Sequence, residues 1–128
     1  MRQVKALSVR GPWAWAILYA GKNIENRSRR TKYRGPLVIH SSRTRDLVAE
    51  DWLRSRRLYF PEDFPTGALV GIVDLVDCLD RVPRNRWASG PFCYVLRNPR
   101  IIAPPVDWRG QLGFFNVPDT FGRDDFAR

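Results

Sequence analysis

One short segment of the chain carries a cation, an anion and a second cation close together. Lys22, Glu25 and Arg27 lie in the sequence GKNIENR, at residues 21–27. If residues 23–27 form a strand, Glu25 and Arg27 point to the same side of it. Glu25 can then accept a hydrogen bond from an exocyclic amine, and Arg27 can hold a phosphate or a carbonyl. Lys22 can act as an electrophile or, if desolvated, as a base.

These residues also have a structural interpretation. Glu25 can form an ion pair that attaches the strand to the end of a preceding helix, and such pairs are common. Asp74 lies in an apolar stretch, where a carboxylate needs a partner. It can serve as a general acid or base, or simply accept hydrogen bonds from Arg27 or the backbone. The single histidine, His40, closes a short strand and can titrate near neutrality or be a satisfied structural residue.

The positive charge of the chain is concentrated around this segment. The 128 residues carry 22 Lys+Arg and 13 Asp+Glu, a formal net charge of +9. Between Lys22 and Arg57 there are 11 basic and 4 acidic residues, a net charge of +7. An arginine-rich stretch beside aromatic residues suits a nucleic-acid surface. A solvated face in a protein that is generally rich in arginine is the alternative.

The elements that must position these side chains follow from breakers and periodicity. Pro12 and Gly21 bracket a helix over residues 12–20, apolar nearly all round, so that Trp13 or Trp15 can border a pocket. A second helix is expected over residues 46–57. The expected strands are residues 5–9, 23–27, 37–40, 67–79, 92–96 and 113–117, with a proline-rich turn at 103–105 between the last two.

These elements predict an α+β fold in a single domain. The length suffices for one hydrophobic core and not for two. Runs of short strands favour a mostly antiparallel sheet, closed or nearly closed into a small β-barrel, with two to three flanking helices. The domain is expected to span residues 1–119, with a polar tail over residues 120–128.

Composition excludes several classes of protein. No apolar run approaches the roughly 18 residues of a membrane-spanning helix, and the first residues lack a secretory pattern, so we expect a cytoplasmic protein with no membrane partner. Cys78 and Cys93 are expected to be small core residues rather than a disulfide. One histidine and two separated cysteines leave too few ligands for zinc, and we expect no metal and no cofactor.

Five segments of the chain, taken in order, resemble the ASCH domain family. They are LSVRGPWAW at 7–15, GKNIENR at 21–27, YRGPLVIHSS at 33–42, GALVGIVDLVDC at 67–78 and RGQLGFFNVP at 109–118. The resemblance covers nearly the whole chain. It implies a PUA-like fold, in which a small β-barrel has helices at its openings and a cleft that in relatives handles RNA or modified bases.

The resemblance also implies a function and a set of binding residues. The cleft motif of the family corresponds to Lys22, Glu25 and Arg27, and Arg10 and Trp13 belong to its first block. We therefore expect an RNA-binding or modified-nucleobase-binding domain, whose partner is RNA, another single-stranded nucleic acid or a modified nucleoside. The candidate nucleic-acid-binding residues are Arg10, Trp13, Lys22, Arg27, Arg29, Arg30, Lys32, Arg34 and His40.

An enzymatic alternative follows from the same resemblance. One bacterial branch of the family hydrolyses the amide of N4-acetylcytidine with a lysine, a threonine and a carboxylate, and another member is a metal-dependent ribonuclease. Lys22 matches that lysine and Asp74 lies in about the right strand, but Glu25 replaces the threonine. Gly11 also stands where many members have glutamine. The alternative is a hydrolase of acylated nucleosides or RNA with Lys22, Glu25 and Asp74 as catalytic residues; an interaction module is a third hypothesis.

Overall fold

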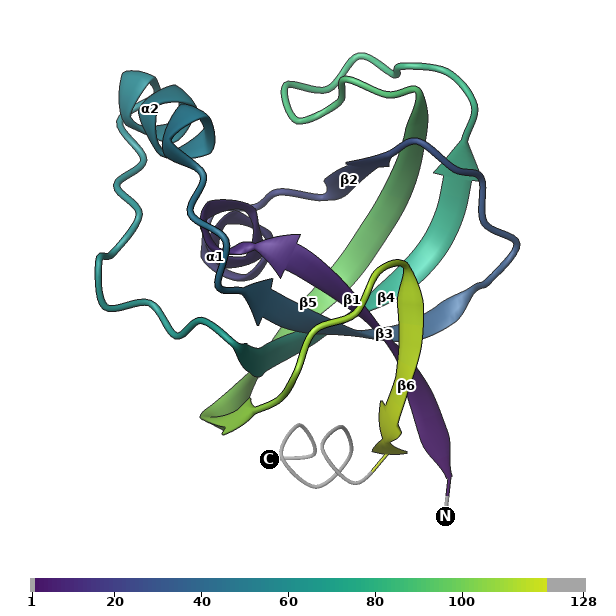
Figure 1. Ribbon diagram of the computed structural model, residues 1–128. Helices are drawn as coiled ribbons and strands as arrows, with labels where there is room; N and C mark the ends of the chain where they lie inside the picture. Colours follow the sequence, from purple (N-terminus) through teal and green to yellow (C-terminus); the bar gives the residue numbers. More distant parts are fainter. Residues whose placement is uncertain (1, 120–128) are drawn as a thin grey trace.

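A computed structural model describes residues 2–119 as one six-stranded mixed sheet with two helices (Figure 1). The strand order is β2-β5-β4-β3-β1-β6. The elements are β1 (Gln3–Arg10), α1 (Gly11–Tyr19), β2 (Ile24–Arg27), β3 (Gly35–Ser42), α2 (Leu47–Ser55), β4 (Ala68–Leu79), β5 (Phe92–Asp107) and β6 (Phe114–Pro118).

Both helices lie where the sequence predicts them, with ends shifted by one or two residues. Pro12 lies in the first turn of α1, where its missing N–H costs nothing. Gly21 adopts a φ of 75° just after the helix, a conformation that disfavours other residues. The N-cap of α2 is Asp46, whose side chain accepts a hydrogen bond from the Ala49 N–H at 2.9 Å. Local signals therefore determine both helices.

The centre of the sheet is buried on both faces. Strands β1 and β3 are parallel, while the other four pairings are antiparallel. Leu37 and Ile39 of β3 pack into a core that includes Ala14 and Ile17 of α1. Val38, which points the other way, packs into a second core with Phe115 of β6. The strands that carry Ser8 and His40 are therefore fixed from both sides.

The sequence prediction of a turn at 103–105 is wrong. These residues belong to β5, which pairs with β4 at Gly71↔Ile101 and again at Leu69↔Val106. Only Val70 lies between Leu69 and Gly71, so residues 102–105 form a bulge opposite it. The ladder needs no N–H from a bulged residue, and proline is tolerated there. Sequence reasoning took two prolines as the end of a strand that continues through them.

The sheet curls strongly, but its strand pairings do not close. Among residues 2–119, the pairings run from β2 at one edge to β6 at the other, and no ladder joins these two strands. The structure thus supports the predicted α+β class with two helices, but it does not show the closure of the sheet into a barrel. The predicted tail at 120–128 lies outside the described residues. Cys93 is buried and Cys78 is half-buried, and both are free thiols.

Candidate functional site

The three charged residues of the GKNIENR segment converge, as predicted. Lys22 Nζ lies 3.2 Å from Glu25 Oε1, and the Arg27 guanidinium lies 3.0 Å from Glu25 Oε2. Lys22 and Glu25 are only 4% and 7% exposed. Lys22 also donates to the Ile24 carbonyl, and Arg27 donates to the Ser8 carbonyl at 2.7 Å. The cluster is therefore an ion-pair network with its hydrogen bonds largely satisfied.

The turn after α1 and the edge of the sheet position this cluster. The Lys22 N–H donates to the Ala16 carbonyl at 3.0 Å, which turns the chain back toward the helix end. Strand β2 then pairs with β5, so that Glu25 lies opposite Tyr94 and Arg27 opposite Phe92. The alternation of the strand puts both charged side chains on one face.

Two members of this cluster, Lys22 and Glu25, line a cavity of about 410 Å³ that we call the tryptophan pocket, whereas Arg27 does not line it. Trp13 and Trp52 meet edge to face, with ring centroids 5.6 Å apart, and Trp52 and Trp87 are tilted at 5.4 Å. Lys22 Nζ lies 5.5 Å from the centroid of the Trp13 ring. The residues that define the pocket are Trp13, Lys22, Glu25, Trp52, Arg86 and Trp87.

Three separate elements bring these rings together. Trp13 comes from the first turn of α1, Trp52 from α2, and Trp87 from the connection between β4 and β5. Asn26 attaches this connection to β2: its amide donates to the Trp87 carbonyl at 2.8 Å, and its oxygen accepts from the Ser89 and Gly90 N–H groups at 2.8 and 3.0 Å. In Figure 1, α2 lies at the upper left of the molecule, and the connection between β4 and β5 lies at the upper right.

Sequence reasoning did not find two of the three rings. It offered Trp13 or Trp15 as the wall of a pocket, and the structure selects Trp13, because Trp15 packs against Phe60 instead. Neither Trp52 nor Trp87 was predicted to be a wall of the pocket. The available signal was Asn26, which lies inside the motif and whose side chain holds the Trp87 connection.

Two arginines reinforce the tryptophan pocket. The Arg56 guanidinium lies 3.8 Å from the centre of the Trp52 ring, and that of Arg86 lies 4.5 Å from the centre of the Trp87 ring. Cations over aromatic faces are attracted by the ring quadrupole. The lining of the pocket therefore combines flat apolar walls, a buried carboxylate and two cations, Lys22 and Arg86, while Arg56 contacts the Trp52 ring from outside the lining.

The basic loop at 28–34 does not line the pocket. Arg30 pairs with Asp80 at 3.1 Å and Arg34 with Asp77 at 3.7 Å. Within residues 2–119, the other two predicted cations of this loop, Arg29 and Lys32, are exposed and form no ion pair. Half of the predicted phosphate contacts are thus already engaged with carboxylates on the surface.

Arg10 and Asp74 lie apart from the buried cluster. Arg10 is 55% exposed at its side chain and lies 3.5 Å from Asp46. Asp74 Oδ1 accepts from Arg100 at 3.1 Å and its Oδ2 from Asn98 at 3.2 Å. Asp74 does not line the tryptophan pocket. The partner that this carboxylate needs is therefore Arg100, from the neighbouring strand β5.

His40 is buried in a second place and is satisfied there. It is 3% exposed, with Nε2 at 2.8 Å from the Trp108 carbonyl and Nδ1 at 2.8 Å from Ser8 Oγ. The carbonyl can only accept, so Nε2 carries the proton and Nδ1 accepts from the Ser8 hydroxyl. Burial lowers the pKa of His40 below its ordinary value; the hydrogen bond to the Trp108 carbonyl opposes this and Arg43 adds to it. The neutral form of the ring therefore predominates at pH 7.

Two classes of site have no support in the described part of the chain. No group of three or more His, Cys, Asp or Glu side chains in residues 2–119 could hold a metal ion. None of the helices in this range is long and apolar enough to cross a membrane.

The six-stranded sheet with its two helices is a PUA-like fold. The chain belongs to the ASCH domain family, whose model matches residues 7–97. A crystal structure of ASCH from Zymomonas mobilis has the same fold, with a TM-score of 0.60 at 13% identity, and the match covers 91% of this chain and 89% of that one.

Two curated relatives are larger proteins. Activating signal cointegrator 1 of Homo sapiens is 33% identical over 109 residues, and that of Mus musculus is 32% identical over the same length. Each match covers 73% of this chain but 19% of the relative. The chain therefore spans about a fifth of the length of the curated relatives it matches.

Proposed function

We propose that the chain is an RNA-binding or modified-nucleobase-binding domain in which the tryptophan pocket receives one base. The observation that carries the proposal is the meeting of three tryptophan rings beside a buried Lys22–Glu25 pair. The proposal treats residues 1–119 as one domain, since β6 completes the sheet beside β1.

The walls of the pocket match the shape of a base. Every base is flat and has a π-face, and stacking on an aromatic side chain contributes roughly 1–3 kcal/mol per base. Trp52 contacts both Trp13 and Trp87, and all three rings line the pocket, so a base that enters it meets an indole face or edge. Stacking on these rings tolerates many bases, and it favours a base that is not already stacked on its neighbours in the strand.

The polar groups of the pocket supply hydrogen bonds for the edge of a base. Lys22 has three N–H donors, of which two point to the Ile24 carbonyl and to Glu25, so that one is left for a ring nitrogen or a carbonyl. Each oxygen of Glu25 accepts one hydrogen bond from a cation and has a second lone pair for an exocyclic amine. A base with an amine next to an acceptor fits this arrangement.

Exposed cations, one at the wall of the pocket and others elsewhere on the surface, would bind the phosphates of the strand. Arg86 lies at the wall of the pocket, and Arg10, Arg29 and Lys32 are exposed elsewhere on the surface. Contacts with phosphates release counterions, so the affinity must fall as the salt concentration rises. The charge of +9 gives the long-range attraction for a polyanion.

The test is binding of single-stranded RNA by the chain and by Trp52→Leu, which keeps an apolar side chain in place. We expect affinity at low salt, a negative salt slope, and about a tenfold or greater loss in the variant. Tyr19→Leu is the matched control, because Tyr19 is an exposed aromatic residue outside the pocket. Absence of binding at low salt, or equal binding by Trp52→Leu, would contradict the proposal.

A hydrolase of acylated nucleosides or RNA is the second candidate function. The observation in its favour is a lysine that is 4% exposed yet lines a cavity beside a carboxylate. The position of Asp74 outside this cavity removes one of the three predicted catalytic groups from reach. Release of acyl groups from modified nucleosides should then disappear in Lys22→Ala, and unchanged turnover in a folded variant rules out this role for Lys22.

A further inference from the structure

A second, larger cavity is lined by Ser8, the residue whose carbonyl accepts a hydrogen bond from Arg27. It has a volume of about 730 Å³ and is lined by residues of β1, β3 and the segment after β5. We call it the arginine cavity, and its defining residues are Ser8, His40, Arg43, Trp108, Arg109 and Gly110. Arg109 and Gly110 belong to the RGQLGFF segment, which does not line the tryptophan pocket.

The floor of the arginine cavity is rigid. The buried His40 ring joins Ser8 on β1 to the Trp108 carbonyl, which ties the segment after β5 to the sheet. Gly110 packs so closely against this pair that a Cβ there would lie 2.6 Å from Ser8 Oγ and 2.7 Å from His40 Cε1. The loop that carries Arg109 is thus held at a fixed place, as a binding site requires.

The charges that face the arginine cavity are mainly cationic. Arg43 and Arg109 are exposed, and neither forms an ion pair within residues 2–119. The lining also includes one carboxylate, Asp107. Elsewhere on the surface, Arg30, Arg45 and Arg54 are paired with carboxylates. Two guanidinium groups that form no ion pair within the described residues lie at one cavity and present the planar donors that match a phosphate.

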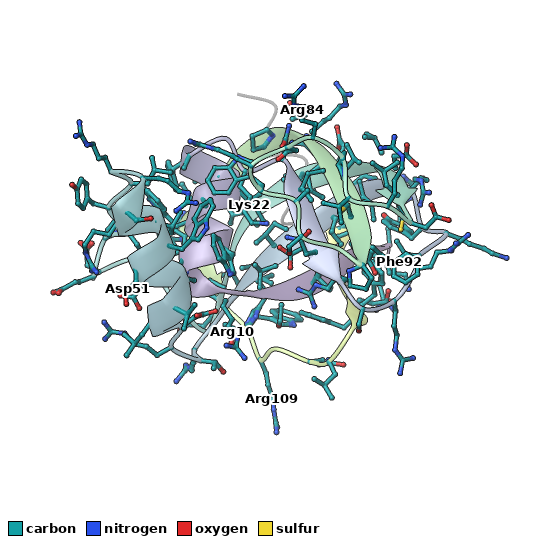
Figure 2. The ribbon with its side chains drawn as sticks, turned by 90° about the horizontal axis from the view of Figure 1, so that it is seen from above. Arg10, Lys22, Asp51, Arg84, Phe92 and Arg109 are labelled. Atoms are coloured by element: carbon teal, nitrogen blue, oxygen red, sulfur yellow. The ribbon has the colours of Figure 1, made fainter. Side chains whose placement is uncertain are left out.

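The arginine cavity and the tryptophan pocket are neighbours along one strand and the helix that follows it. Ser8 lines the former, its carbonyl accepts from Arg27 of the buried cluster, and Trp13 lines the latter. Strand and helix rises place the Cα atoms of Ser8 and Trp13 at most about 11 Å apart. In Figure 2, the exposed Arg10 lies between Lys22 and Arg109, and Arg109 projects outward.

We propose that the arginine cavity is a second subsite, which binds a backbone phosphate of the same single strand whose base occupies the tryptophan pocket. This inference rests on the proposed function. Arg43 and Arg109 hold the phosphate, and Arg10 guides the chain between the two cavities. The separation of the cavities requires a strand of several nucleotides, so a mononucleoside occupies the tryptophan pocket alone.

The experiment compares a mononucleoside with RNA oligonucleotides of up to about twelve nucleotides, a length typical of single-strand binding sites. The proteins are the unchanged chain, Arg43→Ala/Arg109→Ala, and the charge-matched control Arg84→Ala/Arg97→Ala. Arg84 and Arg97 are exposed and line neither cavity, and Arg84 lies across the molecule from Arg109 in Figure 2.

We expect the Arg43/Arg109 variant to bind a mononucleoside as the unchanged chain does and to bind the long oligonucleotides about tenfold more weakly. Loss of this one phosphate contact lowers the magnitude of the salt slope by about 0.7. The control variant should lose less affinity at every length. Equal losses in the two double variants would mean that only total charge matters, and they would overturn the subsite.

The two proposals fail in different ways. If Trp52→Leu weakens binding while the Arg43/Arg109 variant binds long RNA normally, the tryptophan pocket is supported and the second subsite is wrong. If the unchanged chain binds no RNA, or Trp52→Leu binds it normally, the proposed function itself is wrong. A dependence on length in the unchanged chain that disappears only in the Arg43/Arg109 variant supports both.

Discussion

The tryptophan pocket and the arginine cavity lie at the two ends of the segment from Ser8 to Trp13 but are built on opposite plans. The tryptophan pocket has three aromatic walls and a charged floor, Lys22 with Glu25, whose members are neighbours in sequence. The arginine cavity has at its wall two arginines that pair with no carboxylate in residues 2–119, and a neutral floor, Ser8 with His40, whose members are 32 residues apart.

This difference separates two tasks in binding a nucleic acid. Charged groups at a floor, already paired with each other, can discriminate the edge of a base without attracting every anion. Exposed arginines without partners attract phosphate whatever the sequence. The contrast predicts that changes at the charged floor cost more stability than changes at the neutral floor.

The largest expected effect is at Glu25. Glu25→Gln leaves the buried Lys22 ammonium without its carboxylate, and removing one partner of a buried pair costs about 3–5 kcal/mol of the free energy of unfolding. Urea unfolding measures it. The matched control is Asp51→Asn, because the side chains of Asp51 and its partner Arg54 are 76% and 60% exposed, and we expect a loss of about 1 kcal/mol or less. Equal losses would remove the distinction between the floor and the surface.

The sequence predicted the charged floor because its signal is local. Strand alternation puts Glu25 and Arg27 on one face, and Gly21 turns Lys22 toward them. The walls depend on long-range packing: Trp52 and Trp87 approach each other only after α2 and the connection before β5 have folded onto β2. No periodicity in the sequence predicts the contact between Trp52 and Trp87.

The same reasoning explains what could be predicted of the fold. Both helices were found because caps and breakers act within a few residues. The turn at 103–105 was wrong because the pairing of β4 with β5, which absorbs the prolines in a bulge, is a non-local property. For Asp74 the sequence showed that a partner was needed, and only the register of β5 shows that Arg100 supplies it.

The second expected effect is at the neutral floor. Gly110→Ala places a Cβ against Ser8 and His40, and overpacking of this kind costs about 1–3 kcal/mol. Thermal or urea unfolding measures the loss. Combining it with Ser8→Ala removes the atom nearest to the new Cβ and should recover part of that loss beyond the additive expectation. Strict additivity of the two changes would show that the loop does not pack on Ser8 as described.

The smallest expected effect is the titration of His40. Burial and, to a lesser extent, Arg43 lower the pKa of the folded state below 6.5, although the Trp108 carbonyl opposes this. The unfolded chain therefore binds the proton first as the pH falls, and stability is lost from about pH 6.5 downward and is constant above it.

The loss on acidification should be modest, because protonated His40 keeps both of its partners. Nε2 still donates to Trp108, and the Ser8 hydroxyl can rotate to accept from Nδ1. The cost is then the burial of a charge that faces Arg43 and Arg109, offset in part by Asp107. His40→Gln can make the same two hydrogen bonds without titrating, so unfolding at pH 7.5 and pH 5.5 should show less acid destabilisation in that variant. Identical pH profiles for the two proteins would show that the neutral floor does not couple to protonation, and the contrast with the charged floor would then rest on Glu25 alone.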